Sequence, residues 1–103
     1  MKTHGLGTVS YRGIEKKEDW EDYLDLSRDF YRGDFAAASV SESHFSKTFQ
    51  LLMEKSPFVK GYFLEGYGET VGYALLSFSY SNEAGGLVLW LEELFLSPQW
   101  RDQ

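Results

Sequence analysis

Cysteine is absent from this sequence of 103 residues, which excludes disulfide bonds and any chemistry carried by a thiol. Its two histidines, His4 and His44, lie forty positions apart, so no pair of them has the spacing of a metal site. No Walker loop, dinucleotide fingerprint or G-x-S-x-G serine motif occurs either. The sequence therefore predicts no metal site and none of these nucleotide-binding or serine-hydrolase sites.

Basic residues are scarce, with 10 lysines and arginines against 16 acidic residues and a formal charge of −6. Such a balance repels phosphate backbones, so we expect no nucleic-acid partner. An aromatic sheet that binds single strands is disfavoured for the same reason, because it needs a basic groove. The charge fits a small cationic partner such as an amine, although an acidic surface is also a common means of staying soluble.

Long hydrophobic runs are missing as well. The longest apolar-rich run, Leu87 to Leu96, is too short to cross a bilayer and contains two glutamates. The first seven residues have no apolar segment of the signal-peptide type. We therefore expect a cytoplasmic protein without a membrane partner.

The residues that are present suit a folded domain, since 43% are hydrophobic and 17% aromatic. This length allows one domain with one core. Residues 1–8 contain two glycines and are expected to form a flexible tail. Residues 9–103 are expected to form the domain.

Two amphipathic helices are predicted in the first half of the chain. The first is capped by Asp19, carries apolar residues at helical spacing and ends at Gly33. The second begins at Ser41 or Ser43, and Pro57 closes it because proline disfavours helix in the preceding residue.

Four strands are predicted around these helices, over residues 9–14, 59–65, 70–80 and 87–96, with a glycine-bearing hairpin loop at 65–69. Helices must pack on a sheet to bury their apolar stripes, so the fold class is α+β (mixed α/β). The third strand is apolar on both faces, which predicts a central strand covered on each side. The last strand has no stated partner at its far edge, and such edges invite pairing with another chain.

Two adjacent carboxylates, Glu92 and Glu93, interrupt the last apolar strand. Neighbours on a strand point to opposite faces, so both cannot reach water if both faces are covered. Desolvation would make one of them a better proton acceptor and hence a candidate general base. The alternative is that both lie near the solvent end of the strand and only cap the sheet.

The stretch LEELFLSPQWR, residues 91–101, resembles motif A of the GCN5-related N-acetyltransferases (GNATs). Upstream, ETVGYA at 69–74 looks like the third strand of that family, and Tyr11-Arg12 followed by Glu18-Asp19 resembles its opening. The resemblance covers residues 9–103. Within the family, the sequence is most similar to diamine and polyamine acetyltransferases. It implies a GNAT-like acyl-CoA N-acyltransferase fold.

The resemblance also implies an acetyl-CoA-dependent N-acetyltransferase that transfers acetyl to a small primary amine. Glu92 is similar to the residue that takes the amine proton through water, and Glu93 would orient it or bind the cation. Tyr31 and Asp34 lie where relatives form part of the acceptor pocket. The residues expected to contact acetyl-CoA, the co-substrate, are Leu94, Phe95, Leu96 and Arg101.

One departure from the family pattern concerns the end of the sequence. Arg101 stands where R-x-x-G-x-G/A begins, but the sequence stops at Gln103, before the loop that holds the pyrophosphate. We therefore expect a truncated domain that is inactive alone. The alternative is a non-catalytic GNAT-like interaction module that pairs through its last strand as a homodimer or strand-exchanged oligomer. Which amine is acetylated is left open.

Overall fold

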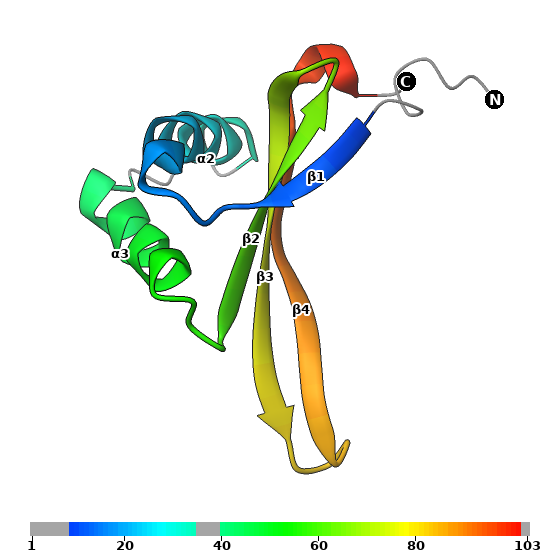
Figure 1. Ribbon diagram of the computed structural model, residues 1–103. Helices are drawn as coiled ribbons and strands as arrows, with labels where there is room; N and C mark the ends of the chain where they lie inside the picture. The colour runs from blue at the N-terminus through cyan, green and yellow to red at the C-terminus, as the bar shows by residue number, and fades with distance from the viewer. Residues whose placement is uncertain (1–8, 35–39, 102–103) are drawn as a thin grey trace, which may run out of the picture.

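The computed structural model describes residues 9–34 and 40–101 of the chain, which form one sheet and two helices (Figure 1). The elements follow in the order β1 (Val9–Gly13), η1 (Lys17–Asp19), α2 (Trp20–Asp34), α3 (Glu42–Met53), β2 (Val59–Gly66), β3 (Glu69–Ser81), β4 (Gly86–Leu96) and η2 (Pro98–Trp100). This order of strand, two helices and three strands confirms the predicted α+β class. The expected tail at residues 1–8 lies outside the described residues.

The sheet has the order β1-β2-β3-β4, and each neighbouring pair is antiparallel. The helices lie between β1 and β2, whereas β2–β3 and β3–β4 are joined by tight turns that contain residues with positive φ. Between β2 and β3, Tyr67 and Gly68 have φ of 51° and 82°, as the two central residues of a type I′ hairpin turn require. The predicted hairpin loop is therefore correct, and it fixes the register of β2 on β3.

Both helices pack on one face of the sheet (Figure 1), where their apolar stripes meet the inward side chains of the strands. α2 contributes Tyr23 and Leu24, and α3 contributes Phe45 and Phe49. The strands supply Phe63, Val71, Tyr73, Leu75 and Phe95, all of them buried. Burial of these aromatic rings is the main stabilising term that the fold can offer, because each ring removes a large apolar area from water.

The opposite face of the sheet is more exposed than the sequence predicted. We expected structure on both sides of β3, yet among the described residues the helices cover only one face. On the other face Ala74, Leu76 and Phe78 are half-buried, and Leu91 of β4 is 58% exposed. Apolar residues on both faces of a strand therefore did not guarantee cover on both.

Asp19 does not cap α2 directly, as was predicted, but fastens the segment that leads into the helix. Its carboxylate accepts the backbone N–H groups of Glu15 and Lys16 and receives two hydrogen bonds from Arg12, at 2.8 and 3.2 Å. Burial alone would raise the pKa of Asp19, but the hydrogen bonds from Arg12 and the Lys16 N–H outweigh it and hold that pKa below its usual range. Helical backbone begins already at Lys17 in η1 and continues into α2 at Trp20, so Asp19 lies inside this segment and its carboxylate faces Arg12 on β1.

Gly72 lies where β3 and β4 approach each other closely. A Cβ added at Gly72 would lie 2.2 Å from the carbonyl oxygen of Phe95, which is backbone and cannot move aside. The glycine therefore allows the pairing of Gly72 with Leu96.

We predict that Gly72→Ala lowers the free energy of unfolding by about 1–3 kcal/mol, because the added methyl group overpacks the ladder between β3 and β4. Gly86→Ala is the matched control, since a Cβ there would meet nothing within 4 Å. Urea unfolding of both variants checks the prediction. Equal stabilities of the two variants would contradict it.

Candidate functional site

A β-bulge in β4 brings both glutamates to the same face of the sheet. Leu75 pairs with Glu93 and Leu76 pairs with Leu91, so Glu92 is an extra residue that the ladder skips. The carboxylate of Glu92 accepts a hydrogen bond from Ser77 at 2.8 Å, and that of Glu93 accepts one from Tyr73 at 2.6 Å. Tyr73 and Ser77 are four residues apart on β3 and share its helix-covered face.

This arrangement corrects the expectation that the two carboxylates point to opposite faces. Strict alternation holds only in a regular strand, and the bulge adds one residue between Leu91 and Glu93. Glu92 is exposed and Glu93 is half-buried. None of the ion pairs found among residues 9–34 and 40–101 involves either glutamate. Two negative charges therefore stand side by side near α2.

Glu93 is held by two phenols from different elements. Tyr31 of α2 donates to Oε2 at 2.5 Å, and Tyr73 of β3 donates to Oε1 at 2.6 Å. Tyr73 is fully buried, whereas Tyr31 is half-buried. Each carboxylate oxygen thus has one strong, charge-assisted hydrogen bond, which fixes the orientation of the whole group.

The structure joins Tyr31 to the predicted site, because α3 supports its ring from the side. The ring contacts those of Phe45 and His44, with centroids 5.7 and 6.4 Å away. Asp34, the other residue expected in the acceptor pocket, is the last residue of α2, and its side chain lies outside the described residues.

The free edge of β4 presents the backbone groups that were expected to contact acetyl-CoA. The Ser97 N–H donates to the Val71 carbonyl at 2.7 Å, so the backbone groups of Ser97 face β3. In an antiparallel pair, every second residue turns its N–H and C=O toward the partner strand. The backbone groups of Phe95 therefore face β3, while those of Leu94 and Leu96 face outward.

The side chains of these expected contact residues have other surroundings. Phe95 is 7% exposed and belongs to the core, so it supports the strand from behind. Leu94 is 54% exposed on the open face of the sheet. Arg101 stacks its guanidinium 5.1 Å from the centre of the Phe95 ring and donates Nε–H to the Leu96 carbonyl at 2.5 Å. Arg101 thus occupies one outward acceptor at the end of β4.

Sequence reasoning missed Tyr73, Ser77 and Ser27. The sequence places Tyr73 with Val71 and Leu75 on one face of a strand expected to be covered on both sides, which is typical of an ordinary core aromatic. Its contact with Glu93 depends on the register between β3 and β4 and on the bulge, neither of which the sequence shows. Ser27 lies one turn from both Tyr23 and Tyr31 on α2 and is fully buried.

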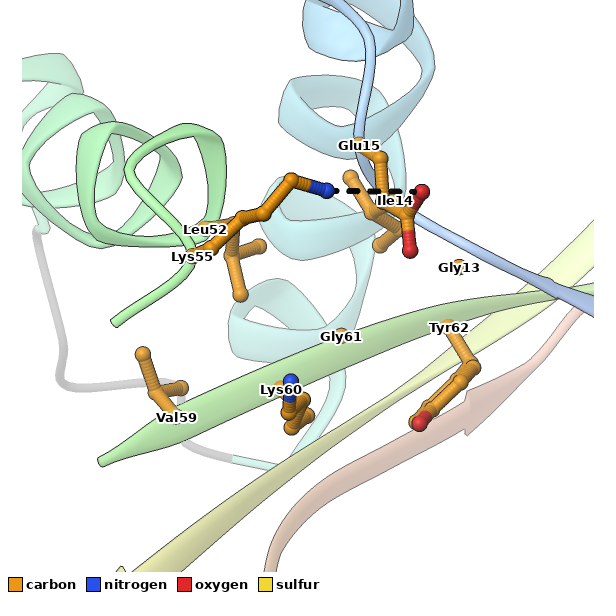
Figure 2. A pocket seen from close by; sticks show the side chains of 9 residues that line it. All are labelled: Gly13, Ile14, Glu15, Leu52, Lys55, Val59, Lys60, Gly61 and Tyr62. Atoms are coloured by element: carbon orange, nitrogen blue, oxygen red, sulfur yellow. Dashed lines mark ion pairs between the residues drawn. The ribbon is translucent and has the colours of Figure 1, made fainter. Parts of the chain in front are cut away.

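Two hollows lie away from these residues. One cavity of about 80 Å³ lies between residues 13–15, the end of α3 and residues 59–62 of β2, and Lys55 reaches across its mouth to Glu15 at 3.8 Å (Figure 2). A wider groove of about 350 Å³ on the open face is lined by Tyr11, Tyr62, Leu64 and Ala74. None of the predicted site residues lines either hollow.

Residues 9–34 and 40–101 lack two further features. They contain no cluster of three or more side chains suited to hold a metal ion. No helix formed by these residues is long and apolar enough to cross a membrane.

Three buried or half-buried tyrosines around the carboxylate make stability depend on alkaline pH. Burial first, and then the hydrogen bond and charge of Glu93, raise the pKa of Tyr31 and of Tyr73 well above the ordinary value of 10.0. Burial raises the pKa of Tyr23 to about 12. All three phenols therefore favour the protonated form in the folded state.

We predict that the free energy of unfolding is constant with respect to these groups below about pH 10 and falls above it. Tyrosines in the unfolded chain lose their protons at about pH 10, whereas these three keep theirs in the folded state. The unfolded state is therefore stabilised relative to the folded state as pH rises. Urea unfolding between pH 8 and about pH 11.5 measures the slope, and Tyr73→Phe should reduce it. A slope that Tyr73→Phe leaves unchanged would contradict this account.

Comparison with known proteins gives likeness of structure only. No protein-family model matches the sequence, and no curated protein matches it significantly. Among solved structures, a possible acetyltransferase from Clostridium difficile 630 is 11% identical with a TM-score of 0.77 over 93% of this chain. An integron cassette protein from the mobile metagenome of Cole Harbour Salt Marsh is 24% identical with a TM-score of 0.77 over the whole chain.

A third solved structure is AAC(6')-Iy in complex with the bisubstrate analog CoA-S-monomethyl-acetylneamine; it is 17% identical and has a TM-score of 0.71 over 92% of this chain. The chain spans 62%, 65% and 61% of these three solved chains, in the order given. At such identities the likeness establishes the fold. The chain has the GNAT-like fold that the sequence predicted, in its β-α-α-β-β-β portion.

Proposed function

We propose that this domain serves an acetyl-CoA-dependent N-acetyltransferase, in which Glu92 accepts the proton of a primary amine. The observation that supports the proposal most directly is the bulge of β4. It places an exposed carboxylate beside a fixed one, next to a strand edge with outward backbone groups. AAC(6')-Iy, which shares the fold, has been solved with a bisubstrate analog of CoA.

The two glutamates suit different tasks. Glu92 is exposed, and its hydrogen-bond partner among the described residues is a neutral serine, so it keeps acceptor capacity for the proton of an incoming amine, directly or through water. Glu93 has both oxygens engaged by phenols and serves as a fixed negative charge that attracts the ammonium form. Glu93 would thus bind the cation, and the more mobile Glu92 would accept its proton.

The edge of β4 fits the co-substrate. Acetyl-CoA supplies the activated acetyl group, and its pantetheine arm carries amides that can pair with the outward backbone groups of Leu94 and Leu96. Arg101 lies at the end of that edge and could turn from the Leu96 carbonyl toward a phosphate. When the ammonium form reacts, its first proton passes to Glu92. An N–C bond then forms as the C–S bond breaks, and a second proton passes from the nitrogen through water to the departing sulfur, which leaves as the CoA thiol.

We also infer that the acceptor carries more than one cationic group, as diamines and polyamines do. Glu92 and Glu93 lie on the same face, and neither takes part in any ion pair found among the described residues. Once the first ammonium group has given its proton to Glu92, the negative charge of Glu93 remains. A second ammonium group on the acceptor would pair with that charge.

Acetyl transfer to a panel of amines, followed by release of the CoA thiol, tests these roles. We expect a diamine such as 1,4-diaminobutane to be acetylated in preference to butylamine, and Glu92→Gln to lower kcat by about 100-fold or more. Glu83→Gln, an exposed carboxylate in the turn between β3 and β4, is the matched control. Acetylation by this chain would show that the domain is active alone, contrary to what the sequence predicts. No transfer to any amine, or equal kcat for the two variants, would reject the proposal.

A second candidate function is a non-catalytic module that pairs through β4. Three leucines on the open face of this strand favour it: Leu87, Leu89 and Leu91 are between 57% and 75% exposed. Among the described residues β4 is also an edge strand. Two copies related by a twofold axis could join these edges into one continuous sheet.

If pairing occurs, we expect a homodimer or a strand-exchanged oligomer in sedimentation experiments, with Leu91→Lys shifting it to monomers. The lysine would place a charge in the apolar contact and oppose a like charge across the axis. Leu51→Lys, on α3 at 39% exposure, is the control that should leave the association unchanged. A wild-type chain that stays monomeric at high concentration would exclude this candidate.

A further inference from the structure

Tyr73 is both a core residue and one of the two hydrogen-bond donors to Glu93. Its ring is fully buried and packs against three other rings, with centroids 5.9 Å from Tyr23, 6.3 Å from Phe30 and 6.5 Å from Phe95. Tyr23 and Phe30 belong to α2 and Phe95 belongs to β4, so the helix and the neighbouring strand together fix the Tyr73 ring. The hydroxyl at its end points at Glu93, where it donates at 2.6 Å.

The hydrogen bond to Glu93 offsets the free-energy cost of burying the Tyr73 hydroxyl. Phenylalanine would fill the same space without the desolvation of a hydroxyl. Burial, and then the hydrogen bond and charge of Glu93, raise the pKa of Tyr73, so the phenol stays protonated and remains a donor. The hydroxyl is therefore a permanent donor aimed at one oxygen of Glu93.

Tyr31, on α2, makes a second hydrogen bond to Glu93. It donates to the other oxygen of Glu93 at 2.5 Å, and its half-buried ring belongs to α2 rather than to the sheet. With one donor on each oxygen, from a strand and from a helix, the carboxylate cannot rotate without breaking a charge-assisted hydrogen bond. Glu92 has no comparable hold, since Ser77 is its hydrogen-bond partner and its side chain is exposed.

We propose that Tyr73 is a positioning residue for the proposed acetyl transfer, holding Glu93 so that its carboxylate faces the incoming amine beside Glu92. The inference rests on the proposed function and adds to it a residue that cannot itself touch substrate, because it is fully buried. Tyr73 acts through Glu93, and Tyr31 completes the hold at the accessible side. Loss of Tyr73 should therefore weaken binding of the amine and leave binding of acetyl-CoA intact.

The test compares Tyr73→Phe with Tyr23→Phe in the 103-residue chain. Tyr23 is the matched control, since it is a buried tyrosine in contact with the Tyr73 ring, at 2% exposure, with no hydrogen bond to Glu93 among those found. Proton NMR reports the hold itself. We expect a slowly exchanging, low-field hydroxyl signal that disappears in Tyr73→Phe and in Glu93→Ala and persists in Tyr23→Phe.

Kinetics report the positioning role. Tyr73→Phe should raise KM for the amine by about 10- to 100-fold, as loss of a hydrogen bond to a charged group predicts, with KM for acetyl-CoA within about twofold of wild type. Tyr23→Phe should change neither KM by more than about twofold. Equal effects of the two variants on KM for the amine, or a uniform loss of stability and activity in Tyr73→Phe, would overturn the proposal.

The outcomes also separate this inference from the function on which it rests. If the hydroxyl signal is present and the wild-type chain acetylates no amine, the proposed function fails and the positioning role fails with it. If the wild type is active and Tyr73→Phe leaves KM for the amine unchanged, only the positioning role is lost. If Tyr73→Phe removes no hydroxyl signal, the hold on Glu93 does not exist and the inference is wrong whatever the activity.

Discussion

The pairing of β3 with β4 is the constraint on which the rest of the structure depends. Its close approach at Gly72 leaves no room for a side chain, and its one irregularity falls at Glu92. A regular ladder would send Glu92 to the open face, away from α2 and the hydroxyl of Ser77. Because the bulge absorbs one residue, two charged neighbours share a face with the tyrosines that hold them. The arrangement of charge follows from a backbone feature.

The two helices also help to position Glu93. α2 and α3 are needed to bury the aromatic core, but α2 also brings Tyr31 to the carboxylate, and α3 packs Phe45 and His44 around that tyrosine. The same packing that stabilises the fold therefore orients a polar group at its margin. This explains why one carboxylate can be rigid while its neighbour stays free, although the two are adjacent in the sequence.

The sequence predicted the fold well and the site only in part. Helical and strand periodicities, with turn residues such as Gly68 and Pro57, are local signals, and they gave the element order and the β2–β3 turn correctly. Asp19 as a cap and cover on both faces of β3 were wrong, because each depends on distant partners: Arg12 in one case and the packing layer in the other. The contact of Tyr73 with Glu93 depends on register and is invisible to local pattern.

The open face of the sheet raises a different physical question. Apolar side chains on the open faces of β3 and β4 are half-buried or exposed, so they give only part of the hydrophobic stabilisation that full burial would give. Exposed apolar surface of this extent is usually covered in the working state of a protein. Cover there would lie behind the strand that carries both glutamates, and it would restrict the motion of β4 without touching the carboxylates. The rigidity of Glu93 and the exposure of Leu91 are thus linked through a single strand, packed on one face and open on the other.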